Sequence, residues 1–219
     1  MDEAGPYATL PRGRHRLSRE DVRASQRGRL LLAMAEAVGE KGYPRTSVAD
    51  VLKRSRVSRE TFYQHFTDKE QCFLNVLDQS ALLLERFFDQ ELSGGDRPLA
   101  RFERALEIYL NTLAGEPSFA RVFFLESYAA GEMAQRKRFA VQERFVQGVT
   151  DNFRDAPAWQ RLPDPEFAGR MLVGAISSLV AGALVRGEVA ELATLREPVM
   201  DLLRSLFGGE ADPARSAGS

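Results

Sequence analysis

Apolar side chains recur along most of this chain at spacings of three and four residues, the period of an α-helix that buries one face. The periodic runs are separated by Gly, Pro and Ser, which favour turns and helix ends. No run alternates apolar and polar residues as a half-buried strand would, and no segment is repeated. We therefore expect an all-α protein of about nine helices, near residues 23–41, 47–54, 59–65, 67–93, 97–114, 117–130, 132–154, 164–186 and 192–207.

The stretch from residue 46 to residue 69 carries the sharpest local signals. Its apolar spacing predicts a short helix over residues 47–54 that opens with a capping-box pattern, and residues 55–57 are long enough only for a turn. Ser58 can then cap a second short helix over residues 59–65. Two short helices joined by a tight turn, the second with a polar exposed face, are typical of a motif that lays its second helix in the DNA major groove.

The residues E-K-G-Y-P-R-T-S-V-A-D-V are followed, after a short gap, by V-S-R-E-T-F-Y-Q-H-F-T-D-K-E-Q. In this order and spacing they resemble the signature of the TetR family of bacterial transcriptional regulators, over about Leu30 to Leu77. Beyond Leu77 the resemblance is one of architecture, a long and divergent helical remainder. Two residues depart from the family pattern: Arg56 stands where a turn glycine is usual, and Leu52 where a small residue is usual. Because glycine relieves a positive φ, Arg56 either strains the turn or marks a different one.

The resemblance implies which side chains meet DNA. Those expected to hold phosphates are Thr46, Ser47, Tyr63, His65 and Lys69. Those expected at base edges are Arg59, Glu60, Thr61 and Gln64. Ser58, at the helix start, is also expected to contact DNA. Phe62 and Phe66 should point inward. The alternatives are half-buried packing for Tyr63 and His65, and for Glu60 an ion pair with Arg59 or Arg56.

Charge is distributed unevenly along the chain. The whole sequence has a net charge of −1, but residues 10–66 contain 13 Lys and Arg against 6 Asp and Glu, so this part carries +7 and the rest −8. A basic part on an acidic body is typical of a protein that presents one end to phosphates. The arginines of residues 12–19 belong either to a solvated tail or to an arm that follows the DNA backbone or enters a minor groove.

These patterns predict a domain order. A flexible basic arm over residues 1–24 precedes a three-helix helix-turn-helix DNA-binding domain over residues 25–70. A larger helical ligand-binding and dimerisation domain follows over residues 71–208, and residues 209–219 form a disordered tail. The helix that begins near residue 67 should leave the small domain and enter the large one.

The middle helices are rich in aromatic residues, which at helical spacing usually form only a core. The resemblance adds a second interpretation, an inducer pocket that is apolar with a few polar groups. No spacing selects among the candidate polar contacts, which are Tyr109, Glu126, Tyr128, Arg136 and Gln142. The expected lining residues are Phe102, Leu106, Tyr109, Phe123, Phe124, Tyr128, Phe145 and Met171. The expected small-molecule effector is therefore apolar or aromatic.

Residues 171–185 carry no charge, a run shorter than a membrane span and flanked by charged residues, so we expect no membrane partner. Small residues spaced by four make a smooth stripe there, and leucine and valine recur in the last helix. In the family, two such helices per subunit form a four-helix bundle with their symmetry mates. The expected homodimer residues are Gly174, Ser178, Gly182, Leu195, Val199, Leu202 and Leu206. The alternative is that this stripe packs inside the monomer.

Composition argues against several other classes of protein. A single cysteine, Cys72, cannot build a disulfide framework and is best explained as a core residue, and two histidines cannot hold a metal alone. Without a Gly-rich phosphate loop or a nucleophile–base pair, we expect no enzyme, no catalytic residue and no cofactor. No signal segment opens the chain, which favours the cytoplasm. The predicted function is a repressor released from a palindromic operator by a ligand, and the alternative is an architectural DNA-binding protein without an effector.

Overall fold

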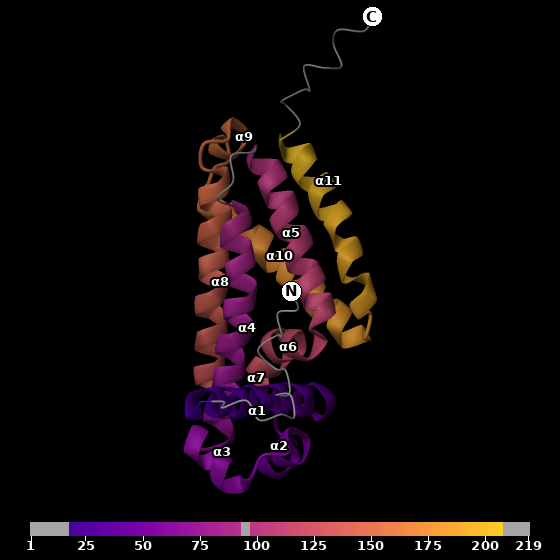
Figure 1. Ribbon diagram of the computed structural model, residues 1–219. Coiled ribbons are helices and arrows are strands. Elements are labelled where there is room, and N and C mark those ends of the chain that lie inside the picture. The colour runs from indigo at the N-terminus through magenta and orange to yellow at the C-terminus, as the bar shows by residue number, and fades with distance from the viewer. Residues whose placement is uncertain (1–17, 93–96, 208–219) are drawn as a thin grey trace, which may run out of the picture. The chain divides into compact units, whose positions relative to one another are not determined.

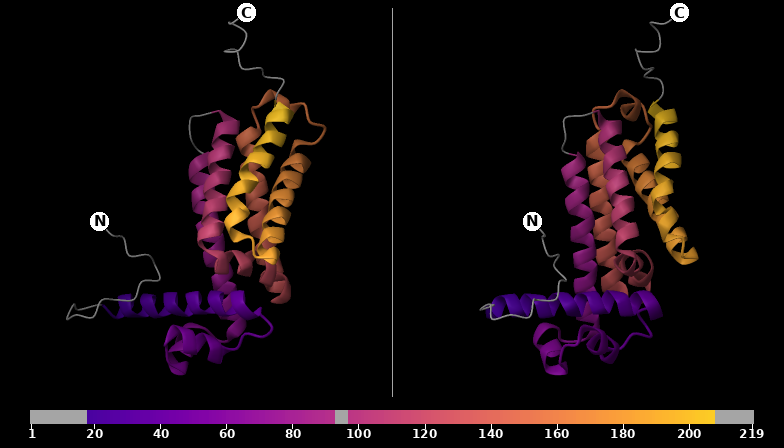
Figure 2. Two further views of the ribbon diagram at one scale, coloured as in Figure 1. Left: turned by 90° about the vertical axis from the view of Figure 1, so that its right-hand side faces the viewer. Right: turned by 45° about the vertical axis from the view of Figure 1, so that its right-hand side comes forward.

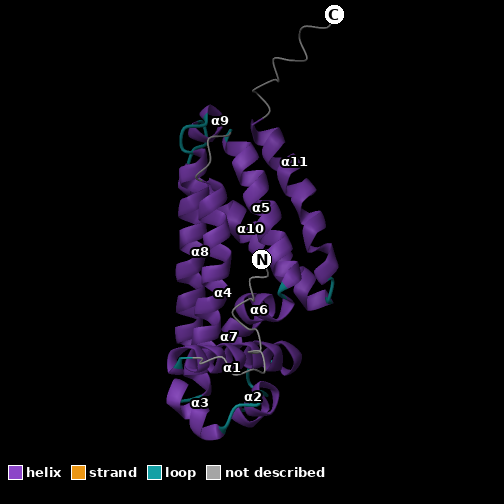
Figure 3. Cartoon of the chain, viewed as in Figure 1, coloured by secondary structure: helices purple, strands orange, loops and turns teal. Residues whose placement is uncertain are grey.

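A computed structural model describes residues 18–92 and 97–207, and for residues 83–92 it describes the helical backbone alone. Throughout this described part the regular structure is helical, with no strand, so the expected all-α class is confirmed (Figure 3). The α-helices are α1 (Arg19–Lys41), α2 (Val48–Ser55), α3 (Arg59–His65), α4 (Lys69–Leu92), α5 (Pro98–Gly115), α6 (Pro117–Arg121), α7 (Ser127–Ala129), α8 (Glu132–Phe153), α9 (Pro157–Gln160), α10 (Pro165–Arg186) and α11 (Arg196–Phe207). A π-helical turn, η1 (Val122–Glu126), joins α6 to α7, and a 3-10 helix, η2 (Val189–Leu195), precedes α11.

The chain forms two compact units. Unit 1 contains residues 1–80 and 118–138, and unit 2 contains residues 81–117 and 139–219. The helices α4 and α8 therefore each contribute residues to both units, as their continuous ribbons in Figure 1 show. Residues 118–138 return to unit 1 after the chain has already entered unit 2.

Unit 1 is built on α1, which packs along α2, as both views of Figure 2 show. Capping boxes begin α1 and α2: the hydroxyl of Ser18 accepts the amide of Asp21, and that of Ser47 accepts the amide of Asp50. Each aspartate accepts in return from the backbone of its capping serine. The unit buries apolar side chains from α1, α2, α3, α4 and η1 and from the residue after α3: Leu30, Met34, Val38, Val51, Phe62, Phe66, Cys72, Phe73 and Phe124.

Unit 2 is centred on aromatic rings. Phe153 lies 5.5 Å from Phe102, 5.0 Å from Trp159 and 4.9 Å from Phe207, measured between ring centroids. These rings come from α5, α8, α9 and α11, so one cluster ties four helices together. Their burial removes a large apolar area from water and dominates the packing of this unit.

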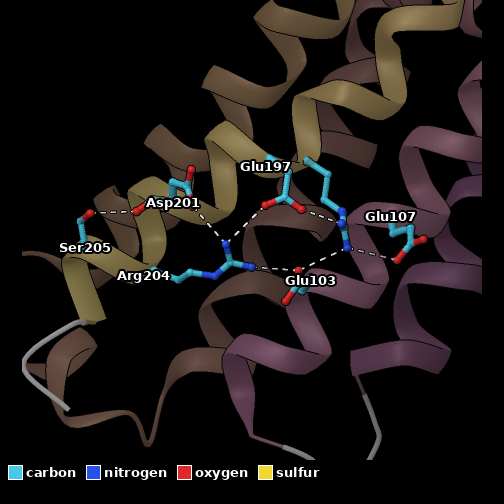
Figure 4. A network of polar contacts seen from close by, with 7 residues as sticks. Glu103, Glu107, Glu197, Asp201, Arg204 and Ser205 are labelled. Atoms are coloured by element: carbon cyan, nitrogen blue, oxygen red, sulfur yellow. Dashed lines mark hydrogen bonds and ion pairs between the residues drawn. The ribbon is translucent and has the colours of Figure 1, made fainter. Parts of the chain in front are cut away.

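An ion-pair network on the surface of unit 2 links α5 to α11 (Figure 4). The carboxylate of Glu103 accepts from Arg204 at 3.0 Å and from Arg196 at 3.3 Å. Arg204 also reaches Glu197 at 3.4 Å and Asp201 at 3.0 Å. Because these side chains are partly exposed, the network orients α11 on α5 more than it stabilises the fold.

Helix α10 is long and apolar enough to cross a membrane by length and composition, although the core helix of a soluble protein can pass the same test. Here it packs in unit 2 through one face, which buries Val173, Ile176, Val180 and Leu184. Its other face remains uncovered in the single chain.

Four local features differ from the sequence prediction. Helix α1 begins at Arg19 instead of near residue 23, because Ser18 and Asp21 cap it where apolar periodicity is still absent. The helix expected over residues 117–130 is interrupted by the π-turn η1, and the short helix α9 was not predicted. Leu195 ends a 3-10 helix instead of lying in the last α-helix. The remainder of the basic arm and the carboxyl-terminal tail lie outside the described residues.

The turn between α2 and α3 resolves the question raised by Arg56. This residue caps α2 in the left-handed conformation, with φ 53° and ψ 37°, and its N–H donates to the carbonyl of Leu52. It is the one non-glycine residue with a positive φ in the described ranges. The turn is therefore the one that a glycine would make, with arginine held in a conformation that L-residues disfavour.

Candidate DNA-binding surface

Helix α3 is held from behind by two buried rings. Its amino terminus is capped by Ser58, whose hydroxyl accepts the amide of Thr61 at 3.0 Å. Phe62 and Phe66 are almost fully buried, with ring centroids 5.6 Å apart, which confirms that they point inward. The helix of seven residues is too short to be stable alone, so these two rings determine its orientation.

The opposite face of α3 is polar and exposed. Arg59, Glu60 and Gln64 are exposed, and the side chain of Gln64 donates to Glu60 at 3.5 Å. Tyr63 is 49% exposed and packs the edge of its ring against Phe62. This face offers one cation, one carboxylate, one amide and one phenol, groups that can hydrogen-bond to base edges and phosphates.

The serine and threonine residues expected at the surface act first as helix caps. Ser47 donates to the carboxylate of Asp50 at 2.7 Å while remaining exposed at the start of α2. Lys41 also contacts this carboxylate, at 2.5 Å, and these hydrogen bonds hold the pKa of Asp50 far below its ordinary value. Ser58 and Thr61 share a hydroxyl–hydroxyl hydrogen bond of 2.8 Å. Ser47 and Ser58 are exposed at the starts of α2 and α3, where a phosphate can approach a helix amino terminus.

Thr46 requires a correction. Its side chain is only 3% exposed, and its hydroxyl donates to the carbonyls of Gly42 at 2.9 Å and Ala37 at 3.2 Å. Its amide donates to the carbonyl of Tyr43. Thr46 therefore fastens the loop between α1 and α2 to the end of α1 and is not available to a phosphate.

Lys69 has a structural role that its sequence position did not predict. Its ammonium lies 4.0 Å from the centroid of the Tyr43 ring and donates at 3.1 Å to the carbonyls of both Tyr43 and Thr46. The side chain is half-buried, so it joins the start of α4 to the loop before α2. Any contact with a phosphate has to be made from this fixed position.

His65, at the end of α3, lies near two arginines that the sequence prediction left out. Burial, followed by the charges of Arg23 and Arg27, lowers the pKa of His65 below its ordinary value. Arg27 also donates to Asn75 and stacks over the ring of Phe66. A signal for this pair was present, because Arg19, Arg23 and Arg27 recur at a spacing of four and so share one face of α1.

The residues expected to line an effector pocket fall in both units. Phe102, Leu106, Tyr109, Phe145 and Met171 belong to unit 2, and Phe123, Phe124 and Tyr128 belong to unit 1. Most are buried, but Met171 is 59% exposed and Tyr128 is 49% exposed. These two are corrections: Met171 lies on the uncovered side of α10, and Tyr128 lies at the surface beneath the guanidinium of Arg138, 4.8 Å from its ring centroid.

Most of the residues expected at a dimer interface are accessible in the single chain. Leu202 and Leu206 are 59% and 53% exposed, Ser178 is exposed, and Gly174, Gly182 and Leu195 are partly exposed. Val199 is a correction, because it is buried with Leu203 and Phe207 on the inward face of α11, where residues recur at a spacing of four. The uncovered side of α10 continues the apolar surface through Phe167, Met171, Leu179 and Val185.

A capped short helix with a polar outer face and a buried aromatic back, set after a tight turn, defines a helix-turn-helix protein. Residues 30–76 match the family described as bacterial regulatory proteins, tetR family. The transcriptional activator FasR of Mycolicibacterium smegmatis is 27% identical over 141 residues, which are 64% of this chain and 64% of that protein. Residues 30–76 are thus similar to the TetR family, and the match with FasR spans less than two thirds of the length of that protein.

Solved structures share the whole architecture. TylP, a TetR regulator from Streptomyces fradiae, is 28% identical with a TM-score of 0.62, and the match covers 90% of each chain. FadR from Bacillus subtilis, solved in complex with stearoyl-CoA, has a TM-score of 0.69 at 19% identity, covering 80% of this chain and 96% of that one. The second likeness, at this identity, is one of fold alone.

Proposed function

We propose that this protein is a homodimeric, sequence-specific DNA-binding regulator, most simply a repressor, whose palindromic operator is released when a hydrophobic small molecule binds. The observation that carries the proposal is the two-faced α3, with Phe62 and Phe66 buried and Arg59, Glu60, Tyr63 and Gln64 directed outward. The groups on this polar face match the donors and acceptors of the major groove.

Within this proposal the side chains have separate roles. Arg59 pairs with guanine and Glu60 accepts from cytosine, each good pair contributing about 1–3 kcal/mol of discrimination. Thr61 and Gln64 complete the base-reading set. Tyr63, Ser47, Ser58, His65 and Lys69 hold phosphates, and Arg23 and Arg27 add positive charge beside His65. The basic charge of this part of the chain supports a phosphate partner.

The uncovered faces of α10 and α11 support a homodimer. Leu202 and Leu206 are exposed beside the buried face of α11, and α10 adds Phe167, Leu179 and Val185. An apolar surface of this extent is unfavourable in water, and two copies related by a two-fold axis would cover it as a four-helix bundle. Two recognition helices then stand in successive major grooves of one operator.

The effector is proposed to be apolar and to bind in unit 2 among the buried side chains of Phe102, Leu106 and Phe145 and the half-buried Tyr109. The aromatic content of this unit supports an apolar guest, and the structurally similar FadR holds stearoyl-CoA. To change the population ratio of the released to the operator-bound conformation from 1:99 to 99:1, the ligand must bind the released conformation more tightly by about 5.5 kcal/mol.

Selection of binding sites from random DNA duplexes tests the proposal. A two-fold symmetric consensus is the expected result, and the absence of any consensus would instead support an architectural DNA-binding protein. Arg59→Ala should relax the preference at one base position of each half-site, whereas Tyr63→Phe should weaken binding to all sequences alike. Arg136→Ala is the matched control, since Arg136 is an exposed arginine of unit 1 that pairs with Glu132 away from α3. An unchanged consensus in Arg59→Ala would remove Arg59 from base reading.

Sedimentation of a double variant, Leu202→Glu with Leu206→Glu, tests the dimer. Both side chains are exposed in the single chain, so the charges should not disturb the monomer core but should dissociate the dimer and abolish tight operator binding. Met133→Glu, an equally exposed apolar position in unit 1, is the control and should remain dimeric. A double variant that sediments as the wild type would place the interface elsewhere.

A further inference from the structure

Tyr43 lies in the loop between α1 and α2, and both its backbone N–H and its backbone carbonyl are hydrogen-bonded. Its N–H donates to the carboxylate of Glu126 at 2.8 Å, and its carbonyl accepts from Lys69 at 3.1 Å and from the amide of Thr46 at 3.2 Å. Its ring packs on Phe73, with centroids 4.6 Å apart. Every one of these partners belongs to unit 1, and the loop they fix leads directly into the helix-turn-helix.

Glu126 reaches this loop from the π-turn η1, at a separation of 83 residues along the chain. Gly42 allows the close approach: it has φ +81°, and a Cβ at this position would lie 3.3 Å from the Glu126 carboxylate. A second bond from the same segment runs from Arg121 to the carbonyl of Gly39 at 3.1 Å. The segment therefore holds the end of α1 and the following loop by two main-chain groups.

The π-turn determines where Glu126 points. A π-turn contains one residue more than an α-helical turn, so conversion to regular α-helix would rotate Glu126 relative to α6 by about 100°. Such turns are sparsely populated elements and are often found at functional sites. Rotation of this size would withdraw the carboxylate from Tyr43.

The segment of residues 118–138, which contains η1, is joined at both of its ends to residues of unit 2. Residues 118–138 belong to unit 1, but the chain enters them from unit 2 and returns to unit 2 after Arg138. A change in unit 2 that displaces either end of the segment must therefore be transmitted to η1 through the chain itself. Direct contacts between η1 and α1 pass it on inside unit 1.

We infer that Glu126 is a positioning residue for operator binding: its bond to the Tyr43 amide holds the loop, and through it α2 and α3, in the DNA-binding arrangement. This inference rests on the proposed function. The bond is charge-assisted, and without it a partly buried N–H loses its acceptor. Glu126 was one of five candidate polar contacts for the effector in the sequence, and one oxygen of its carboxylate accepts from the main chain at Tyr43.

The test compares Glu126→Ala, Glu126→Gln and Glu132→Ala on the duplex that the wild type enriches from a random pool. Glu126→Ala should bind it about tenfold more weakly, which corresponds to about 1.4 kcal/mol. Glu126→Gln, whose amide oxygen still accepts the Tyr43 N–H, should restore most of this loss. Glu132→Ala, which removes an exposed carboxylate of the same segment, should bind as the wild type does.

Two further readouts separate positioning from phosphate contact and from general loss of structure. The slope of log affinity against log salt should be the same for Glu126→Ala and wild type, because no phosphate contact is removed. Hydrogen exchange in the free protein should accelerate at the Tyr43 amide in Glu126→Ala and not at the buried centre of α1.

The outcomes are distinguishable. If the wild type enriches no consensus, the proposed function fails, and the inference with it. If the wild type enriches one and Glu126→Ala binds it equally tightly, or Glu126→Gln is no better than Glu126→Ala, the inference alone is overturned.

Discussion

The two units keep their helices in place by different means. Unit 1 contains two short helices of the candidate DNA-binding surface, α2 with 8 residues and α3 with 7. Hydrogen bonds between main-chain groups and the side chains of Thr46, Lys69 and Glu126 fix the loop before these helices. Unit 2 contains helices of 18 and 22 residues, α5 and α10, and relies on a cluster of stacked rings.

The difference follows from what each unit has to do. A short helix gains little stability from its own hydrogen bonds, so contacts with the rest of its unit must determine its angle if it is to meet a base pair. In unit 1 these are the rings of Phe62 and Phe66 behind α3, together with directional bonds to the loop before α2. Apolar packing is non-directional and allows helices to slide by small amounts. The proposed reading surface thus lies in the unit that fixes its loop by directional bonds, and the residues proposed for the effector lie in the unit centred on stacked rings.

The largest effect should come from removing one central ring in each unit. Phe62→Ala and Phe153→Ala should each lower the free energy of unfolding by about 3–5 kcal/mol, because both rings are fully buried. The protein has a single tryptophan, Trp159, which stacks on Phe153 in unit 2. Fluorescence therefore reports on unit 2, while far-UV circular dichroism reports on the whole chain.

If the units have separate stability, Phe62→Ala should lower the circular dichroism midpoint and leave the fluorescence midpoint nearly unchanged. Phe153→Ala should shift the fluorescence midpoint strongly. Equal shifts of both signals in both variants would show one cooperative structure and would remove the contrast between the units.

Replacing Arg56 should sharpen the account of unit 1. Arg56→Gly relieves a left-handed residue that costs about 1–2 kcal/mol, and the greater freedom of glycine in the unfolded chain offsets part of this gain. Urea unfolding should therefore show a net stabilisation of about 0.5–1 kcal/mol. Arg56→Ala is the control, since it removes the guanidinium but keeps the strain, and a gain of the same size there would refute the backbone explanation.

Glu103→Gln tests how much the stability of unit 2 depends on the ion-pair network between α5 and α11. The change removes the carboxylate that Arg196 and Arg204 share, and the partial exposure of these groups predicts a loss of stability that is smaller in size than the gain from Arg56→Gly. The loss should shrink further between 0.05 and 0.5 M salt, roughly the range over which exposed charges become screened. A large loss that salt does not change would mean that the network carries the packing of α11.

The smallest effect concerns pH. The pKa of His65 is lowered in the folded protein, so between that pKa and the ordinary value of about 6.5 the unfolded chain binds more protons than the folded one. The contribution of His65 to stability is therefore complete above pH 6.5 and decreases as the pH falls through this window. His65→Gln should make the unfolding midpoint less dependent on pH between 5 and 7, and an unaltered pH dependence would assign it to other groups.

Local signals in the sequence were sufficient to predict the helix α3. The Ser58 cap follows from residues three positions apart, and the inward positions of Phe62 and Phe66 follow from the family resemblance. For Arg56 the sequence left two alternatives, and the left-handed conformation is the strained one. The all-α class follows from periodicity in the same way.

The contacts that hold this helix in place could not be found by spacing. Glu126 meets Tyr43 across 83 residues and through a π-turn that leaves no sequence pattern. The burial of Thr46 and the two hydrogen bonds from Lys69 to main-chain carbonyls depend on how the loop folds back on α1. The inward position of Val199 was missed because Leu202 and Leu206 suggested one apolar face on α11 where there are two.

The discontinuity of unit 1 has a consequence for synthesis on the ribosome. The first 80 residues emerge early, but the residues that complete this unit end at Arg138, after another stretch of unit 2 has already been made. The nascent helix-turn-helix must wait for Arg121 and Glu126 before the end of α1 and its loop acquire their final hydrogen bonds. A fragment truncated after residue 80 would therefore be an incomplete reader of DNA, and grafting this module onto another protein requires both pieces of the chain.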